Sequence, residues 1–498
     1  MHLLRAIPAL SLVLGARAAL AQTPAECPVD VYQPAVLTQA SLSIGKAAQA
    51  GATAEAPKAL RDAMKFLQDE KKYANNPVGA GFLKGQIFIL WLYQTGIGET
   101  ATYEQLNMKG EKTTKVDLIA TADSLFKAVE ALAPACFQET LQWRGTKPWT
   151  DRINKAYAFL GSNSLDSAAY WADRSAMLNP SSPFVHNILA QLAKQRDDIP
   201  AMLGHLRAAI IEAKKDTALG ETVRQMQFQL ASTEQQFAMG KGAGSKAALN
   251  AEALALYSTL LNGTPATADG AYAFSSASEI IMLGQDTVAA KVLLAPLVAD
   301  ATPYGDLTLL LAADLARGFG RNDDAMAMYA GALAKNPNIR DANYFLAYMY
   351  YEAKMPEKML PLTERLLIID PSNGDNYLMR AYAYQLMAAT EKDAKKKAEL
   401  VKQQDALAAQ ETALSAAHKL LITKFERRIA GADLTGMVEN YSKVARAYTV
   451  SFEFLDIAGN VVEAMTAQIA TVKPSEKGQF ELIPTKPGIV AYRYAAIK

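Results

Sequence analysis

Residues 306–373 read DLTLLLAADLARGFGRNDDAMAMYAGALAKNPNI (306–339) and RDANYFLAYMYYEAKMPEKMLPLTERLLIIDPSN (340–373). Each segment closes on a short proline turn, Asn336-Pro337 in the first and Asp370-Pro371 in the second, 34 residues later. Proline cannot continue a helix, and it disfavours helical backbone at the residue before it. The two segments therefore predict successive helical units of equal length, each ended by a proline turn.

Small and aromatic residues recur at matching places in these units, and this pattern resembles the tetratricopeptide repeat (TPR). That repeat is a helix–turn–helix unit of about 34 residues that stacks into a solenoid. Leu309, Met359 and Thr363 depart from its consensus. The alternative is a generic array of helical hairpins, which has nearly the same architecture. The matching residues are Ala325, Tyr329 and Ala332, then Leu346, Ala347 and Tyr350, and then Tyr377, Ala381 and Tyr384 in a third unit opening at Gly374.

A weaker version of the pattern lies upstream, where Asn179-Pro180 closes a unit that begins at Trp149. The resemblance implies a mainly α fold, a TPR-like α-solenoid of antiparallel helix pairs. Beyond Met387 the leucines at 400, 407, 414 and 421 recur every seven residues, which predicts one long helix from about 398 to 428.

The period then changes from helical to alternating. After a linker at 431–436, Tyr448, Val450, Phe452 and Phe454 alternate with polar residues, which is typical of strands. Gly459-Asn460 suits a hairpin turn. The sequence therefore predicts a small C-terminal antiparallel β-sheet or sandwich over 437–498. We expect it to dock on the last helices, because a module of this size is marginally stable alone.

The N-terminus has the pattern of a secretory signal peptide. His2 and Arg5 precede an apolar run, and Ala19-Leu20-Ala21 forms an A-x-A cleavage site. We expect cleavage after Ala21 and a secreted or periplasmic mature chain. An uncleaved anchor is the alternative, although the apolar run is short for a membrane span of about 20 residues.

An oxidising compartment favours a disulfide between Cys27 and Cys136, the two cysteines of the chain. Two buried free thiols are the alternative. The full division is a signal peptide (1–21), an N-terminal helical region (22–148), degenerate repeat-like hairpins (149–305), clear repeats with the long helix (306–430) and the β module (437–498).

Composition and motifs argue against several functions. The 51 basic and 50 acidic residues give a net charge of +1, which disfavours an electrostatic nucleic-acid partner. The glycine-rich loop at 240–246 does not fit a phosphate-binding loop, because Lys246 follows Ser245. His186, His205 and His418 fall on separate predicted helices, so no metal motif emerges. We therefore expect no catalytic residues, no metal and no cofactor.

The resemblance implies a binding groove lined by the first helix of each repeat. Positions 2, 5, 9 and 12 of the second clear repeat are Asp341, Tyr344, Tyr348 and Tyr351. Tyrosines flanked by charges suit an extended peptide or a docked helix. The alternative is that these tyrosines pack between helices or under the C-terminal sheet. The neighbouring repeats add Asp314 and Arg317 on one side and Asp375 and Tyr382 on the other.

These features predict a non-enzymatic interaction scaffold or adaptor of the cell envelope, which binds a protein or peptide through the concave face of the solenoid. A permanent structural subunit of an envelope complex is one alternative, and an enzyme with an unrecognised site is another.

Overall fold

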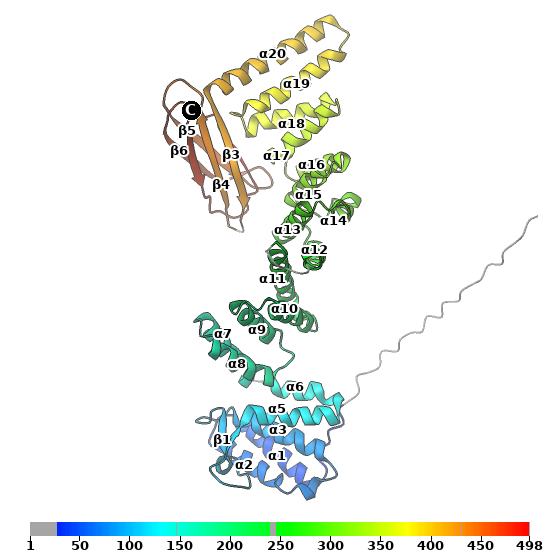
Figure 1. Cartoon of the computed structure of the whole chain (residues 1–498), viewed down its shortest axis with the longest axis vertical. Helices are drawn as coiled ribbons and strands as arrows, with labels where there is room; N and C mark the ends of the chain where they lie inside the picture. The colour runs from blue at the N-terminus through cyan, green and yellow to red at the C-terminus, as the bar shows by residue number, and fades with distance from the viewer. Residues whose placement is uncertain (1–26, 146, 240–245, 429, 498) are drawn as a thin grey trace, which may run out of the picture. The chain divides into compact units, whose positions relative to one another are not determined.

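The computed structural model describes residues 27–145, 147–239, 246–428 and 430–497. The chain divides into two compact units, Met1–Met226 and Gln227–Lys498 (Figure 1). The predicted signal peptide and the glycines of the 240–246 loop lie outside the described residues. The fold is mainly α, built of antiparallel helix pairs with two small antiparallel sheets at the C-terminal end.

The first part of unit 1 is a helical bundle around α3 (Pro77–Trp91). Eleven residues of this helix are buried, because its sequence is apolar on all sides. Gly85 lets α3 approach Phe126, since a Cβ at this position would lie 2.6 Å from the ring. The other elements are α1 (Ala35–Ala50), α2 (Glu55–Phe66), η1 (Glu70–Tyr73), β1 (Thr100–Thr102), α4 (Tyr103–Leu106), β2 (Lys115–Asp117), α5 (Leu118–Leu132), η2 (Pro134–Cys136) and α6 (Phe137–Arg144).

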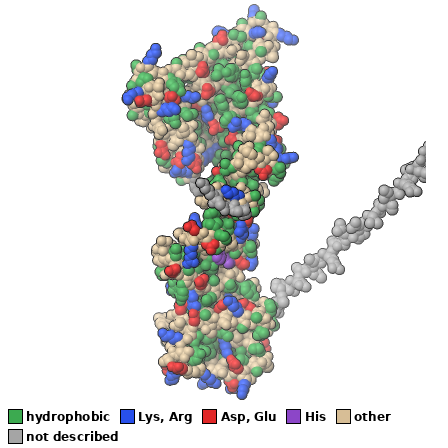
Figure 2. Space-filling view, viewed as in Figure 1, with side chains coloured by type: hydrophobic (Ala, Val, Ile, Leu, Met, Phe, Trp, Pro, Cys, Tyr) green, Lys and Arg blue, Asp and Glu red, His purple; other side chains and the backbone are tan. Residues whose placement is uncertain are grey.

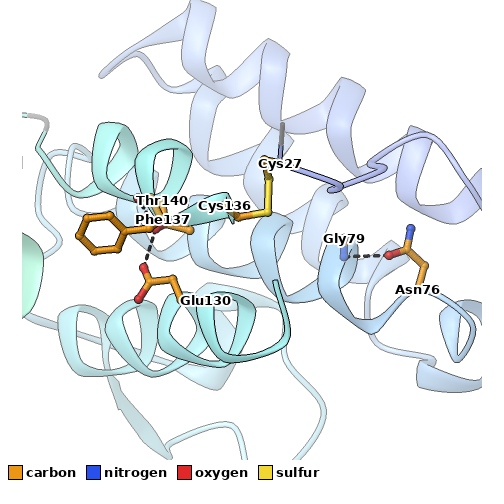
Figure 3. Close-up of a disulfide and its surroundings, with 7 residues drawn as sticks. All are labelled: Cys27, Asn76, Gly79, Glu130, Cys136, Phe137 and Thr140. Atoms are coloured by element: carbon orange, nitrogen blue, oxygen red, sulfur yellow. Dashed lines mark hydrogen bonds between the residues drawn. A yellow bond between two sulfur atoms is a disulfide. The ribbon is translucent and has the colours of Figure 1, made fainter. Parts of the chain in front are cut away.

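Cys27 and Cys136 form a disulfide that ties the start of the described chain to η2 (Figure 3). Asn76 holds the same segment from the other side. Its Nδ2 donates to the carbonyls of Asp30 and Gln33, and its Oδ1 caps α3 by accepting from the amide of Gly79 at 2.9 Å. The lead-in to α1 is therefore fixed at two points.

Helical hairpins follow in unit 1, joined to the bundle by buried arginines. Arg174 donates to Asp117 at 2.6 and 2.7 Å and to Glu99 at 3.0 Å. Burial by itself would raise the pKa of Asp117, but the hydrogen bond and charge of Arg174 outweigh it and lower that pKa. The helices are α7 (Lys147–Gly161), α8 (Leu165–Leu178), α9 (Pro183–Gln195) and α10 (Ile199–Ala213), with η3 (Thr217–Leu219) after them.

Unit 2 contains the clear repeats. The three first helices begin at Asp306, Arg340 and Gly374, the residues at which the sequence places the repeat starts. Ala325, Tyr329, Ala332 and Ala347 are fully buried, as the resemblance implies. The helices are α11 (Gly220–Met239), which contains the unit boundary, α12 (Lys246–Gly263), α13 (Ala268–Gly284), α14 (Thr287–Ala299), α15 (Asp306–Gly318), α16 (Asn322–Lys335), α17 (Arg340–Glu352), α18 (Pro356–Ile369), α19 (Gly374–Thr390) and α20 (Ala394–Ala417).

The prediction of one helix from 398 to 428 is wrong beyond Ala417. Residues His418–Arg427 form strand β3, so His418 is not helical and the β module begins about 19 residues before the expected 437. The expected linker at 431–436 lies largely within β4 (Ala432–Asn440). Pairing of β3 with β4 along nearly its whole length overrides the heptad pattern, which placed Leu421 on a helix.

The C-terminal module is a sandwich of two three-stranded antiparallel sheets, ordered β3-β4-β7 and β6-β5-β8. The predicted alternation is confirmed, because Tyr448, Val450, Phe452 and Phe454 are buried in the core between the sheets. The expected hairpin at Gly459-Asn460 joins β5 to β6. The remaining strands are β5 (Arg446–Leu455), β6 (Val461–Val472), β7 (Lys477–Leu482) and β8 (Ala491–Tyr494).

The sandwich docks on the repeats, as expected, and residues of the proline turns make many of the contacts. The Tyr494 hydroxyl donates to Asp370, and the Asn336 amide donates to the carbonyl of Val490 at 3.3 Å. Arg427 of β3 makes a two-pronged ion pair with Asp306, the first residue of α15, at 2.8 and 3.0 Å. Figure 1 shows the strands beside the helices of these repeats.

Candidate partner-binding pocket on the first helices

A pocket of about 120 Å³ lies between α17 and α19, the first helices of two successive repeats. Five of the eight predicted partner-binding residues line it. We call this site the tyrosine pocket. Its lining residues are Tyr344, Tyr348, Tyr351, Asp375, Leu378, Met379 and Tyr382.

Helix geometry explains why these side chains converge. Tyr344, Tyr348 and Tyr351 are spaced by four and three residues, which places them on one face of α17. The ring of Tyr351 stacks on that of Tyr382 from α19, with centroids 5.1 Å apart. The tyrosines are therefore arranged by packing between the repeats, yet Tyr348 keeps 44% of its surface exposed.

The charges at the pocket are mainly negative. Burial, followed by the nearby carboxylate of Asp375, raises the pKa of the Tyr344 hydroxyl. A hydrogen bond to the carboxylate of Glu352 raises the pKa of the Tyr348 hydroxyl. Both phenols are therefore neutral at physiological pH.

The three remaining predicted residues lie outside the pocket lining. The Tyr329 hydroxyl donates to Asp314 at 2.5 Å, and Arg317 donates to that hydroxyl at 3.2 Å. Burial raises the pKa of Asp314, although the hydrogen bond from Tyr329 opposes this. These contacts link α15 to α16, so packing within the repeat already engages both side chains. Asp341 is exposed and accepts from Arg340 at 2.7 Å.

Two pocket residues, Leu378 and Met379, were missed from the sequence. Leu378 stands at position 5 of its repeat, the position that Tyr344 occupies one repeat earlier. Its repeat position therefore indicates Leu378, although its side chain is neither aromatic nor charged. Nothing in the sequence singles out Met379, which is buried against the pocket floor.

His186 and His205 lie on separate helices, as predicted, but their rings are in contact. His186 of α9 and His205 of α10 stack with ring centroids 5.8 Å apart. Burial, and for His186 also the neighbouring imidazole, lowers the pKa of both. Within the described ranges, no group of three or more His, Cys, Asp or Glu side chains is placed to hold a metal ion. Over the same ranges, no helix has the length and apolar character needed to cross a membrane.

The fold and the pocket together define a TPR-like helical-repeat protein with a C-terminal β-sandwich. No family model matches the chain, and no curated protein matches it.

Among solved structures, the chain is similar to an assembly chaperone of RpL4 (Acl4, residues 1–338). The two share 17% identity, covering 50% of this chain and 99% of that one, with a TM-score of 0.25. It is also similar to a tetratricopeptide repeat protein from Parabacteroides merdae. That pair shares 17% identity, covering 52% and 98% of the two chains, with a TM-score of 0.23. The fold assignment itself rests on the repeat period and helix pairs described above.

Proposed function

We propose that this chain is a non-enzymatic interaction scaffold of the cell envelope, which binds a protein or peptide partner at the tyrosine pocket. The observation that carries the proposal is the convergence of Tyr344, Tyr348 and Tyr351 with Asp375 and Tyr382 in one partly exposed pocket. Tyrosine is enriched at the energetic centres of protein interfaces, because it offers a large apolar area and a polar tip.

The balance of charges supports a protein partner over a polyanion. Figure 2 shows basic and acidic side chains interspersed over the visible face, and the net charge is +1. The envelope location rests on the N-terminal pattern of residues 1–21 and agrees with the disulfide, which persists in oxidising compartments. Mass spectrometry of exported material should find Gln22 as the first residue, and an intact Met1 would contradict export by cleavage.

The experiment is site-specific photo-crosslinking in the native organism. A benzophenone amino acid replaces Tyr348, which is 44% exposed, and in a matched control it replaces Tyr441 of the β module, which is 43% exposed. The proposal predicts a discrete crosslinked protein from position 348 that is absent from position 441. The product should weaken when Tyr382→Ala is added, because this removes the stacking partner of Tyr351.

Two results would overturn the proposal. Equal crosslinking from both positions would indicate non-specific contact, and no product from position 348 would exclude a protein at the pocket. Turnover of a small molecule by the purified protein, abolished by a pocket substitution, would show an enzyme instead.

A permanent subunit is the second candidate, favoured by an exposed apolar stripe on α14. Val288 and Val292 are 70% and 67% exposed and lie one turn apart on α14, and Leu283 at the end of α13 is 67% exposed. Large permanent interfaces are more apolar than transient ones. This candidate predicts that the purified chain self-associates and that Val292→Lys restores a monomer in sedimentation experiments.

A further inference from the structure

The lining of the tyrosine pocket is aromatic and acidic. It contains four tyrosine rings and one carboxylate, together with Leu378 and Met379, and no basic side chain. The face of an aromatic ring carries negative charge density and attracts cations, with a gain of about 2 kcal/mol when the cation is desolvated. A carboxylate at the same site would strengthen that attraction through a charge-assisted hydrogen bond.

The chain itself already places one arginine over a neighbouring ring, Phe345, and another over Tyr344, one of the four pocket rings. The guanidinium of Arg317 lies 4.2 Å from the ring centre of Phe345, and that of Arg340 lies 5.6 Å from the ring centre of Tyr344. Arg340 is also shared between Asp341 and the buried Asp370. Both arginines are therefore engaged by groups of their own chain.

The remaining pocket groups have no such cation. Among the residues that the structure describes, no lysine or arginine lies over the rings of Tyr348, Tyr351 or Tyr382. In the same part of the chain, Asp375 is exposed and takes part in no ion pair. Glu352 beside Tyr348 adds a further negative charge.

The size of the pocket limits the occupant. At about 120 Å³ it is well below the roughly 300–1,000 Å³ of sites that enclose a drug-sized ligand or cofactor. An apolar cavity of about 150 Å³ holds one benzene molecule. The pocket therefore has room for one side chain.

We propose that the tyrosine pocket takes a single lysine or arginine side chain of the partner, packed against the tyrosine rings with its charge toward Asp375. The occupant is a basic segment of a protein, argued from the negative charge of the site. This inference rests on the proposed function and specifies the chemistry of the partner.

The test selects peptides with the mature chain from a displayed library of random dodecapeptides. Selected peptides should share a lysine or arginine at one position. Replacing that residue by glutamine should weaken binding about tenfold or more in fluorescence anisotropy, the loss expected for a desolvated cation on aromatic rings.

Variants of the chain distinguish recognition of a cation from non-specific apolar binding. Asp375→Asn should weaken binding about tenfold, whereas Asp405→Asn, the same change at an exposed position of α20, should leave it unchanged. Tyr348→Phe keeps the ring and should retain binding. Tyr348→Leu keeps an apolar side chain without the ring and should lose it. Circular dichroism of each variant establishes that it is folded.

The cationic assignment is overturned if selection yields no peptide, if acidic or apolar residues anchor the peptides, or if Asp375→Asn binds as wild type does. Displacement of a bound peptide by tetramethylammonium at micromolar concentration would point to a small amine as the natural ligand and would also overturn it. If position 348 still crosslinks to a protein in these cases, the scaffold function stands and only the chemistry of the partner is wrong. If position 348 also gives no crosslinked protein, both the scaffold function and the cationic partner are wrong.

Discussion

Tyr348 and Tyr350 lie two residues apart on α17 but face different surroundings. Tyr348 is half exposed at the tyrosine pocket. Tyr350 is half-buried and packs against the hydrophobic clusters on both sides of α17, with Lys358 over its ring at 5.3 Å. Because successive helical residues differ by 100° in direction, neighbours in sequence can serve binding and packing separately.

We expect Tyr350→Ala to destabilise unit 2 by about 2–3 kcal/mol, somewhat less than the roughly 3–5 kcal/mol of a fully buried aromatic residue. Tyr348→Ala should change stability by less than about 1 kcal/mol and weaken partner binding by about 2 kcal/mol. Urea unfolding beside a binding titration measures both quantities. If the two variants unfold alike, Tyr348 is a packing residue and the pocket assignment fails.

The buried ion pairs of Arg174 should contribute to the stability of unit 1. Its guanidinium is buried and satisfies the carboxylates of Glu99 and Asp117. Arg174→Met should destabilise unit 1 by about 1–3 kcal/mol, because Asp117 and Glu99 both lose a buried hydrogen-bond donor, although Glu99 keeps its ion pair with Arg152. The control is Arg224→Met, whose ion pair with Glu221 is exposed and should contribute less than about 1 kcal/mol. If the two variants lose the same free energy of unfolding in urea, the buried ion pairs contribute no more than the exposed one.

At the scale of elements, the proline turns serve two purposes. They end the second helix of each repeat, and their polar residues hold the β-sandwich through Asn336, Asp370 and Ser372. Strand β3 adds the pair between Arg427 and Asp306. The sandwich is thus fastened along the edge where the repeats turn, and the face of the first helices at α17 and α19 keeps its pocket.

This docking predicts a pH dependence. Burial alone would raise the pKa of Asp306, but the hydrogen bond and charge of Arg427 lower it below its ordinary value. A carboxylate with a lowered pKa stabilises the fold above its unfolded pKa of about 4, and that stability is lost as the pH falls through the folded value. Asp306→Asn should therefore cost about 2 kcal/mol at pH 7, and this cost should shrink as the pH falls toward and through the lowered pKa of Asp306.

Urea unfolding of wild type and Asp306→Asn at pH 7 and pH 3 measures that difference. Asp405→Asn, on the exposed face of α20, is the control and should match wild type at both values. A deficit of Asp306→Asn that persists unchanged at pH 3 would show that the ion pair with Arg427 is not its source.

At the scale of the whole molecule, the chain is two compact units with separate hydrophobic cores. Only unit 1 contains the disulfide, which closes a loop with a sequence separation of 109 residues. In the chain-entropy model, a loop of this length stabilises by at most about 4–5 kcal/mol.

Calorimetry should therefore show a transition that a reductant moves down by up to about 10–15 °C, together with one that it leaves in place. The replacement Cys27→Ser should reproduce the shift without reductant. Equal movement of all transitions would mean that the two units do not unfold independently. No shift in either experiment would mean that the bond contributes little to stability.

Much of the architecture was determined by the sequence alone. The 34-residue period placed the starts of α15, α17 and α19, because helix ends are set locally by proline and turn residues. The alternation from Tyr448 to Phe454 predicted β5. The repeat positions predicted five of the residues that line the tyrosine pocket. Each of these signals is a short-range pattern that repeats.

Other features were decided only by the tertiary structure. Strand β3 looked helical because its Leu421 continues a heptad of leucines, and only pairing with β4 selects the strand. The links from Arg427 to Asp306 and from Tyr494 to Asp370 join residues more than 120 positions apart, as no local pattern can indicate. No local pattern indicates the stack of His186 on His205 either. Backbone preferences act over a few residues, whereas burial and ion pairing depend on what the folded chain brings near.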